Sequence, residues 1–281
     1  MKPGRPSITA SFVAYARATA AVSPMTTPPL RDPLAGALVP FPFSLFVPRG
    51  PIGQRAARMA SLGLVDHIAL RTCAIDDAIG GGATASGPRQ LVILGAGLDG
   101  RAYRMESLAG ARVFEVDHPA THAAKTARAR SLSAHSKSIA HVAVDFGADD
   151  LSVALAAHGH DAALPTAWIL EGVTMYLPGP ITRLLFAKVA TASASGSVFA
   201  LTYLEPLPHP MLHKAANGMF TLLGEPLGNS FRSDEIAEAL AGVNMTIRSD
   251  TGPYDWARRF GASAALATLF GNERLAVAVK A

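Results

Sequence analysis

The 281-residue sequence has a single cysteine, Cys73, so no disulfide bond can form within the chain. A lone thiol is typical of a reducing compartment, and we expect a cytoplasmic protein. The sequence also lacks any run of about 18 apolar residues, which predicts that no segment spans a membrane. Arg17 interrupts the semi-apolar stretch near the N-terminus, and this argues against a secretory signal.

Dense clusters of basic residues with interleaved aromatic residues are missing as well, although the formal net charge is +4. This disfavours a nucleic-acid partner. The basic excess lies in residues 1–89, which hold nine basic and four acidic residues, whereas the remainder is nearly balanced. Two interpretations fit: ordinary solvated arginines, or a segment that faces an anionic small molecule.

Charged residues make up only 16% of the chain and hydrophobic residues 49%, so a large core can form and wholesale disorder is excluded. We divide the chain into an N-terminal extension, residues 1–88, and a main domain, residues 89–281. The extension is rich in proline over residues 21–53, which predicts short helical turns and loops, and residues 54–79 have helical character. We expect the extension to form part of a lid and substrate site. Its apolar side chains are expected to pack on the main domain: Leu38, Phe41, Phe43, Leu45 and Phe46.

The main domain alternates between short apolar runs and helical patterns. Predicted strands are Gln90–Leu94, Arg112–Val116, His141–Asp145, Ala167–Leu170, Ser197–Tyr203, Asn244–Ser249 and Arg274–Val279. Predicted helices are Arg101–Leu108, Pro119–Ser131, Asp149–His158, Pro180–Ala194 and Ser233–Leu240. This order predicts an α/β fold with a doubly wound, mostly parallel seven-stranded sheet, whose last two strands can run antiparallel. Residues 205–231 are too long for an ordinary turn, so we expect a lid or binding insert there.

The first chemical motif follows the first strand of the main domain, where Gly95, Ala96 and Gly97 open a turn before a helix. Glycine permits tight turning and close approach of the backbone to a ligand. The spacing Gly95-x-Gly97-x-x-Gly100 also matches the dinucleotide fingerprint. Alone, this pattern fits an adenosine-containing cofactor or a simple glycine-rich turn.

Acidic residues end the next two strands. Asp117 comes about 20 residues after the glycines, where a carboxylate can accept hydrogen bonds from both hydroxyls of an adenosine ribose. The alternative is a solvated acid. Asp145 is placed to accept from an adenine amino group beside the Phe146 ring, or else to serve as a helix cap or turn residue.

The fourth strand of the main domain is followed by Glu171, Gly172 and Tyr176. Ligands bind at the carboxyl ends of such strands, so these residues are expected around the reacting end of the cofactor. For Tyr176, core packing is the alternative. Arg71 falls inside an apolar helical stripe, where it either snorkels from the edge or points into the site to bind a carboxylate.

In these segments the chain resembles the leucine carboxyl methyltransferase family, closest to its bacterial branch of S-adenosylmethionine-dependent O-methyltransferases of polyketide and other secondary metabolism. The matching segments are residues 61–72, 75–77, 94–104, 114–119, 144–146, 171–177 and 224–226. The resemblance implies a class I methyltransferase fold with S-adenosylmethionine as cofactor. It also implies donor contacts from Arg71, Gly95, Asp117, Asp145 with Phe146, and Glu171, with Arg71 on the donor's methionine carboxylate. Phe146 departs from the leucine common in the family.

The predicted donor site consists of the residues that the resemblance implies, together with Ala96, Gly97, His118 and Gly172. His118 is expected beside the adenine. We predict no metal site. A carboxylate acceptor needs no general base, whereas a phenol or alcohol usually does. Candidates for a base are Tyr176, His209 and His213. The two histidines are four residues apart and can share a helical face, or they can be ordinary solvent-exposed loop residues. The acceptor is expected to be a small molecule, with an anionic one favoured by the basic extension, and its identity and the oligomeric state stay open.

Two other functions fit part of the pattern. A nicotinamide-dependent oxidoreductase shares the glycine turn and the acid. Such enzymes often have a Tyr-x-x-x-Lys pair, and in this sequence no tyrosine is followed by a lysine four residues later. A non-catalytic binding protein of the same fold would bind the donor without turnover.

Overall fold

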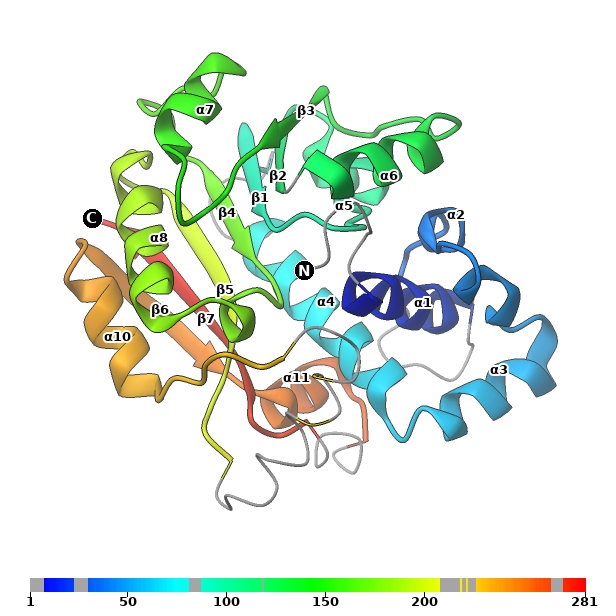
Figure 1. Ribbon diagram of the computed structural model, residues 1–281. Coiled ribbons are helices and arrows are strands. Elements are labelled where there is room, and N and C mark those ends of the chain that lie inside the picture. Colours follow the sequence, from blue (N-terminus) through cyan, green and yellow to red (C-terminus); the bar gives the residue numbers. More distant parts are fainter. Residues whose placement is uncertain are drawn as a thin grey trace.

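The computed structural model describes residues 8–22, 30–80, 87–117, 119–207, 218, 221, 226–263 and 270–281. A seven-stranded sheet in the order β3-β2-β1-β4-β5-β7-β6 forms its centre (Figure 1). The strands are β1 Gln90–Leu94, β2 Arg112–Asp117, β3 Ser138–Ala143, β4 Ala167–Leu170, β5 Val198–Leu204, β6 Met245–Thr251 and β7 Glu273–Lys280.

The strand directions confirm the predicted doubly wound sheet. β1 pairs in parallel with both β2 and β4, and β7 runs antiparallel between β5 and β6. The chain order therefore reverses beside β1, which creates the switch point where ligands of α/β sheets bind. Leu94 is in register with Val116 on one side and with Leu170 on the other, so three strand ends meet there.

Helices cover both faces of the sheet because residues along each strand alternate between two apolar cores. Val92 and Leu94 face one core, and Leu91 and Ile93 face the other. The first core includes residues of α7 (Leu151–Ala157), α8 (Gly179–Thr191) and α10 (Ser233–Ala241). The second includes residues of α4 (Leu64–Gly80), α5 (Arg101–Arg104), α6 (Pro119–Ala129) and α11 (Pro253–Phe260).

The N-terminal extension contains α1 (Ile8–Val22), α2 (Ala35–Leu38), the 3-10 turn η1 (Phe43–Phe46) and α3 (Gly50–Ala60). The short elements after residue 30 agree with the proline-rich sequence. The helical stretch predicted over residues 54–79 is instead two helices, because Leu62 and Gly63 have φ angles of 50° and 91° and break the chain between α3 and α4. In Figure 1, α3 lies at the outer end of the extension, away from the sheet.

Other differences from the predicted elements are local. β3 begins and ends earlier than expected, so Asp145 lies beyond the strand. The helix expected over residues 101–108 is divided into α5 and the 3-10 turn η2, Glu106–Leu108. Of the insert, the structure describes only residues 205–207, 218, 221 and 226–231. No helix in the described ranges is long and apolar enough to cross a membrane.

Burial of the extension's apolar residues was predicted wrongly in part. Leu38 is fully buried and Phe43 half-buried, but Phe41, Leu45 and Phe46 are 76%, 69% and 66% exposed. The reason is that η1 and α3 stand out from the molecule, and not one residue of α3 is buried.

A buried ion pair joins the strand that carries Asp117 to the helix that follows it. Glu115 on β2 and Lys125 on α6 are both fully buried, with 2.6 Å between Oε1 and Nζ, and His141 lies 3.3 Å from the other carboxylate oxygen. Burial raises the pKa of Glu115, but Lys125 and His141 outweigh it and the net pKa is lowered. Glu115 is thus anchored toward α6.

Replacing Lys125 with Met should lower the free energy of unfolding by about 3–5 kcal/mol, because the Glu115 carboxylate loses its main counter-charge inside the core. Urea unfolding at neutral pH measures this. Arg258→Met is the matched control, because the Arg258–Asp255 pair is largely exposed and should contribute at most about 1 kcal/mol. Equal, small losses in both variants would contradict the assigned role of the buried pair.

Candidate active site

The glycine turn and the acid after β2 are in direct contact. Gly95 and Gly97 have φ angles of 69° and 49°, and the Gly97 N–H donates to Asp117 Oδ2 at 2.6 Å. A Cβ on Gly95 would lie 2.5 Å from Val173 Cγ2, so only glycine allows the turn to pack against the segment after β4. The half-buried Asp117 therefore stands at the loop, where the sequence predicts a ribose partner.

Asp145 lies at the neighbouring strand end and is exposed. Its Oδ1 accepts the Gly147 N–H at 2.8 Å, and its own N–H donates to Asp149. This is the turn role that the sequence left open beside an adenine contact. Phe146 is half-buried and packs on the core of the sheet.

Arg71 points inward. On α4 it is buried, with Nη2 2.8 Å from Glu171 Oε1 and Nη1 2.9 Å from Glu273 Oε1. The snorkelling alternative is thus wrong, and the guanidinium lies beside the predicted Glu171. Glu273, at the start of β7, was missed because it is 202 residues away in sequence; an acid at the head of an apolar strand was the available signal.

These pairs belong to a larger ionic network, in which each charged side chain contacts at least one of opposite sign. Arg101 is its centre: its guanidinium lies 2.7 Å from Asp76 and 2.8 Å from Glu171, and it also contacts Asp99. The full ionic network consists of Arg17, Asp32, Arg104, Asp76, Arg101, Asp99, Glu171, Arg71, Glu273 and His67. Four arginines face five carboxylates, so one negative charge is in excess when His67 is neutral.

The network keeps its carboxylates ionised despite burial. Burial raises the pKa of Glu171, but Arg101 and then Arg71 lower it to about 2. Burial likewise opposes ionisation of Glu273, and Arg71 and His67 lower its pKa to about 2. The pKa of Arg101 is raised well above its usual value by Asp99, Glu171 and Asp76, against the effect of burial.

The other predicted residues divide into those placed and those outside the described ranges. Gly172 has a φ of 66°, and its N–H donates to Thr202 Oγ1. Tyr176 is half-buried in the 3-10 turn η3, Thr174–Tyr176, immediately after Glu171 and Gly172. Ala96 is buried within the glycine turn. His118, His209 and His213 lie outside the described residues.

These residues fit the donor that the family resemblance implies. S-adenosylmethionine carries a sulfonium, an ammonium and a carboxylate, and its net charge of about +1 complements the excess negative charge of the ionic network. In addition, the buried Nη2 of Arg101 has no hydrogen-bond partner among the described residues. Within those residues, no group of three or more His, Cys, Asp or Glu side chains is arranged to hold a metal ion.

Two solved structures share this architecture. A "duf574 family protein" from Streptomyces avermitilis has a TM-score of 0.61 at 16% identity, covering 81% of this chain and 89% of its own. A protein of Thermobifida fusca described as "a putative methyltransferase" has a TM-score of 0.60 at 17% identity, covering 99% and 96%. The strand order is that of the class I methyltransferase fold, with the glycine turn and the acid after β2 at its switch point.

Sequence comparison narrows this class. The family model for leucine carboxyl methyltransferase matches residues 10–190. A protein of Streptomyces coelicolor, SCO7813, is 44% identical over 199 residues, or 69% of this chain and 68% of its own. A protein of Mycolicibacterium smegmatis is 40% identical over 222 residues, or 77% and 70%. Both carry the name "Putative S-adenosyl-L-methionine-dependent methyltransferase".

The chain belongs to the leucine carboxyl methyltransferase family and is an S-adenosylmethionine-dependent methyltransferase. The resemblance predicted from the sequence is thereby confirmed. None of these comparisons supports the nicotinamide-dependent alternative.

Low pH should reduce the free energy of unfolding, because the carboxylates of the ionic network become protonated. A carboxyl group with a lowered folded pKa contributes stability above its unfolded pKa of about 4.3, and this is lost as the pH falls toward the folded value. With folded pKa values of about 2 for Glu171 and Glu273, the free energy of unfolding should fall from pH 5 to pH 2. Urea unfolding across this range measures the slope.

The variant Glu273→Gln serves as the test of that cause, because it cannot titrate. Its unfolding free energy should be lower than that of the wild type at pH 7 and should depend less on pH below 5. A slope identical to the wild type would show that other carboxyl groups control acid unfolding.

Proposed function

We propose that this methyltransferase transfers the methyl group of S-adenosylmethionine to an oxygen atom, of a carboxylate or of a phenol or alcohol, on a small molecule of secondary metabolism. The observation that carries the donor site is the convergence of the glycine turn, Asp117 and the Arg71–Glu171 pair at three adjoining strand ends. The single cysteine supports a cytoplasmic location.

On the donor side, the residues bind and orient. The glycine turn lets the backbone approach the ligand, Asp117 accepts from the ribose hydroxyls, and Asp145 with Phe146 and His118 borders the adenine. Arg71 holds the carboxylate of the methionine part and Glu171 holds its ammonium group. The backbone of Ala96 and Gly172 borders the donor beside them. S-adenosylmethionine supplies an already activated methyl group, so orientation is the main task left to the protein.

On the acceptor side, the protein needs a general base only if the acceptor oxygen carries a proton at neutral pH. A carboxylate is ionised at neutral pH and can accept the methyl group without a base. The family name refers to carboxyl groups, which supports an oxygen acceptor. For a phenol or alcohol, Tyr176 is the described candidate beside the donor site, and His209 and His213 are the others.

Replacing Asp117 with Ala should weaken the affinity for S-adenosylmethionine by about 1–3 kcal/mol, because the ribose hydroxyls lose their partner. Isothermal titration measures the dissociation constant. Arg71→Lys should produce a loss of similar size, since a point charge replaces a planar guanidinium, and it avoids leaving Glu171 and Glu273 unpaired. Arg258→Ala, at the surface, should bind as the wild type does. Unchanged affinity in Asp117→Ala would mean that the ribose lies elsewhere, and binding of NAD(P) in place of S-adenosylmethionine would overturn the proposal.

The oxygen acceptor is tested by incubating the protein with S-adenosylmethionine and a panel of carboxylic acids, phenols, thiols and amines, with products read by mass spectrometry. We expect methyl esters or methyl ethers. Tyr176→Phe should leave ester formation unchanged and reduce ether formation if Tyr176 is the base. Methylation of nitrogen or sulfur alone would contradict the proposal.

A further inference from the structure

The extension carries a groove that the donor site does not use. It has a volume of about 460 Å³ and is lined by Leu45, Phe46, Val47, Pro48, Arg49, Gly53 and Ala57. We call it the α3 groove. Its volume lies within the range of about 300–1,000 Å³ that is usual for small-molecule sites.

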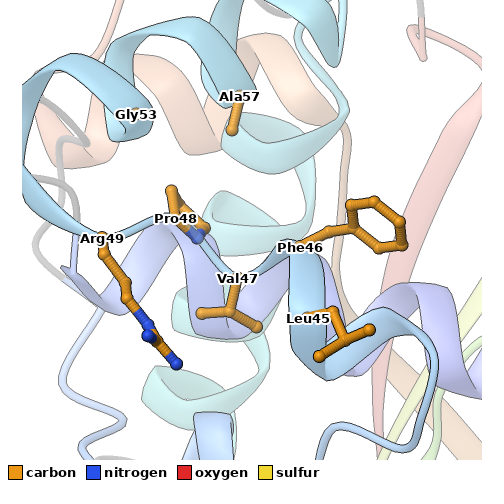
Figure 2. Close-up of a pocket in the computed structure, with 7 residues that line it drawn as sticks. All are labelled: Leu45, Phe46, Val47, Pro48, Arg49, Gly53 and Ala57. Carbon is orange, nitrogen blue, oxygen red and sulfur yellow. The ribbon is translucent and has the colours of Figure 1, made fainter.

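The groove runs between α3 and the segment that precedes it. In Figure 2, Gly53 and Ala57 lie on α3 above this segment, and the Ala57 methyl group points toward it. Phe46 lies at one end and Arg49 at the other. A Cβ on Gly53 would lie 3.7 Å from Pro48 Cβ, so helix and segment are in contact beside Gly53.

The groove presents apolar side chains at the surface. Leu45 and Phe46, which line it, are 69% and 66% exposed. Large exposed apolar patches on a soluble domain commonly mark binding sites. Leu45 and Phe46 both belong to the side chains that the sequence led us to expect inside the core.

The charges near the groove favour an anionic ligand. No acidic residue occurs between residues 33 and 65, whereas Arg49, Arg55 and Arg58 lie there. Arg58 is paired with Asp66, and the exposed Arg49 lines the groove itself. An apolar wall with one cation at its end suits an amphiphilic anion and disfavours a cation.

The groove is also connected to the glycine turn by packed side chains. Phe43 and Val47 pack in one apolar cluster with Leu98, the residue after Gly97. The rings of Phe43 and Phe12 on α1 are 6.1 Å apart. Val47, which lines the groove, therefore packs against the same apolar cluster as the loop residue Leu98.

We propose that the α3 groove is a separate binding site for an amphiphilic anion, whose apolar body lies against Leu45, Phe46 and Val47 and whose anionic group is held by Arg49. The inference goes beyond the proposed function, since it assigns a class of ligand to a groove outside the donor site.

The test is isothermal titration with two probes of equal chain length, dodecanoate and dodecyltrimethylammonium, below their micellar concentrations. The wild type should bind dodecanoate at one site per chain and bind the cation at least tenfold more weakly. Ala57→Trp fills the groove and should weaken dodecanoate binding at least tenfold. Arg49→Glu, an exposed substitution, should weaken dodecanoate binding similarly and improve binding of the cation.

Matched controls are Val153→Trp on α7 and Arg248→Glu on β6, both at exposed positions, which should leave dodecanoate binding unchanged. Melting temperatures check that every variant is folded. Dodecanoate binding that neither Ala57→Trp nor Arg49→Glu weakens would overturn the inference. So would binding only to vesicles of phosphatidylglycerol and phosphatidylcholine, or a dimer that Ala57→Trp dissociates, because these assign the groove to a lipid surface or a second copy.

The two proposals fail separately. A wild-type protein that binds S-adenosylmethionine but not dodecanoate refutes the groove assignment and leaves the proposed function standing. A protein that does not bind S-adenosylmethionine refutes the proposed function whatever the dodecanoate result.

Discussion

The buried ionic network is the interaction on which the rest of this structure depends. Removing ionised side chains from water costs several kcal/mol for each, and only close opposite charges offset it. Here each arginine lies within ion-pair distance of at least one carboxylate, and the carboxylates come from the segment before α2, from α4, the glycine turn, the end of β4 and the start of β7. No one of these elements can keep its charge buried without the others, so the network fixes their relative positions.

The network also ties the N-terminal extension to the region of the glycine turn. Arg17 on α1 lies near Asp32 and donates to the Leu98 carbonyl beside the glycine turn. Arg71 reaches the same region from α4. The proposed donor-side groups are therefore held between the extension and the sheet, whereas α3, which has no buried residue, supplies none of the residues of the ionic network.

Local patterns predicted the parts of this site that are close in sequence. The strand–glycine–helix order and Asp117, twenty residues later, gave a contact that the structure contains, and the apolar stripe around Arg71 indicated a buried helix. Glu273 and Arg17 could not be found this way, because their partners are distant and no periodicity links them. The exposed Phe41 and Phe46 were misplaced because hydrophobicity predicts burial only where a neighbouring surface exists.

The antiparallel β7 has a consequence for how the protein matures. β7 is the last strand in the chain order but lies inside the sheet, between β5 and β6. During synthesis, both of those strands must wait with an unpaired edge until β7 has left the ribosome. Because β7 also brings Glu273 to Arg71, the proposed methyl-donor site reaches its final form only in that last step, and a nascent chain has the glycine turn long before the Arg71–Glu273 pair can form.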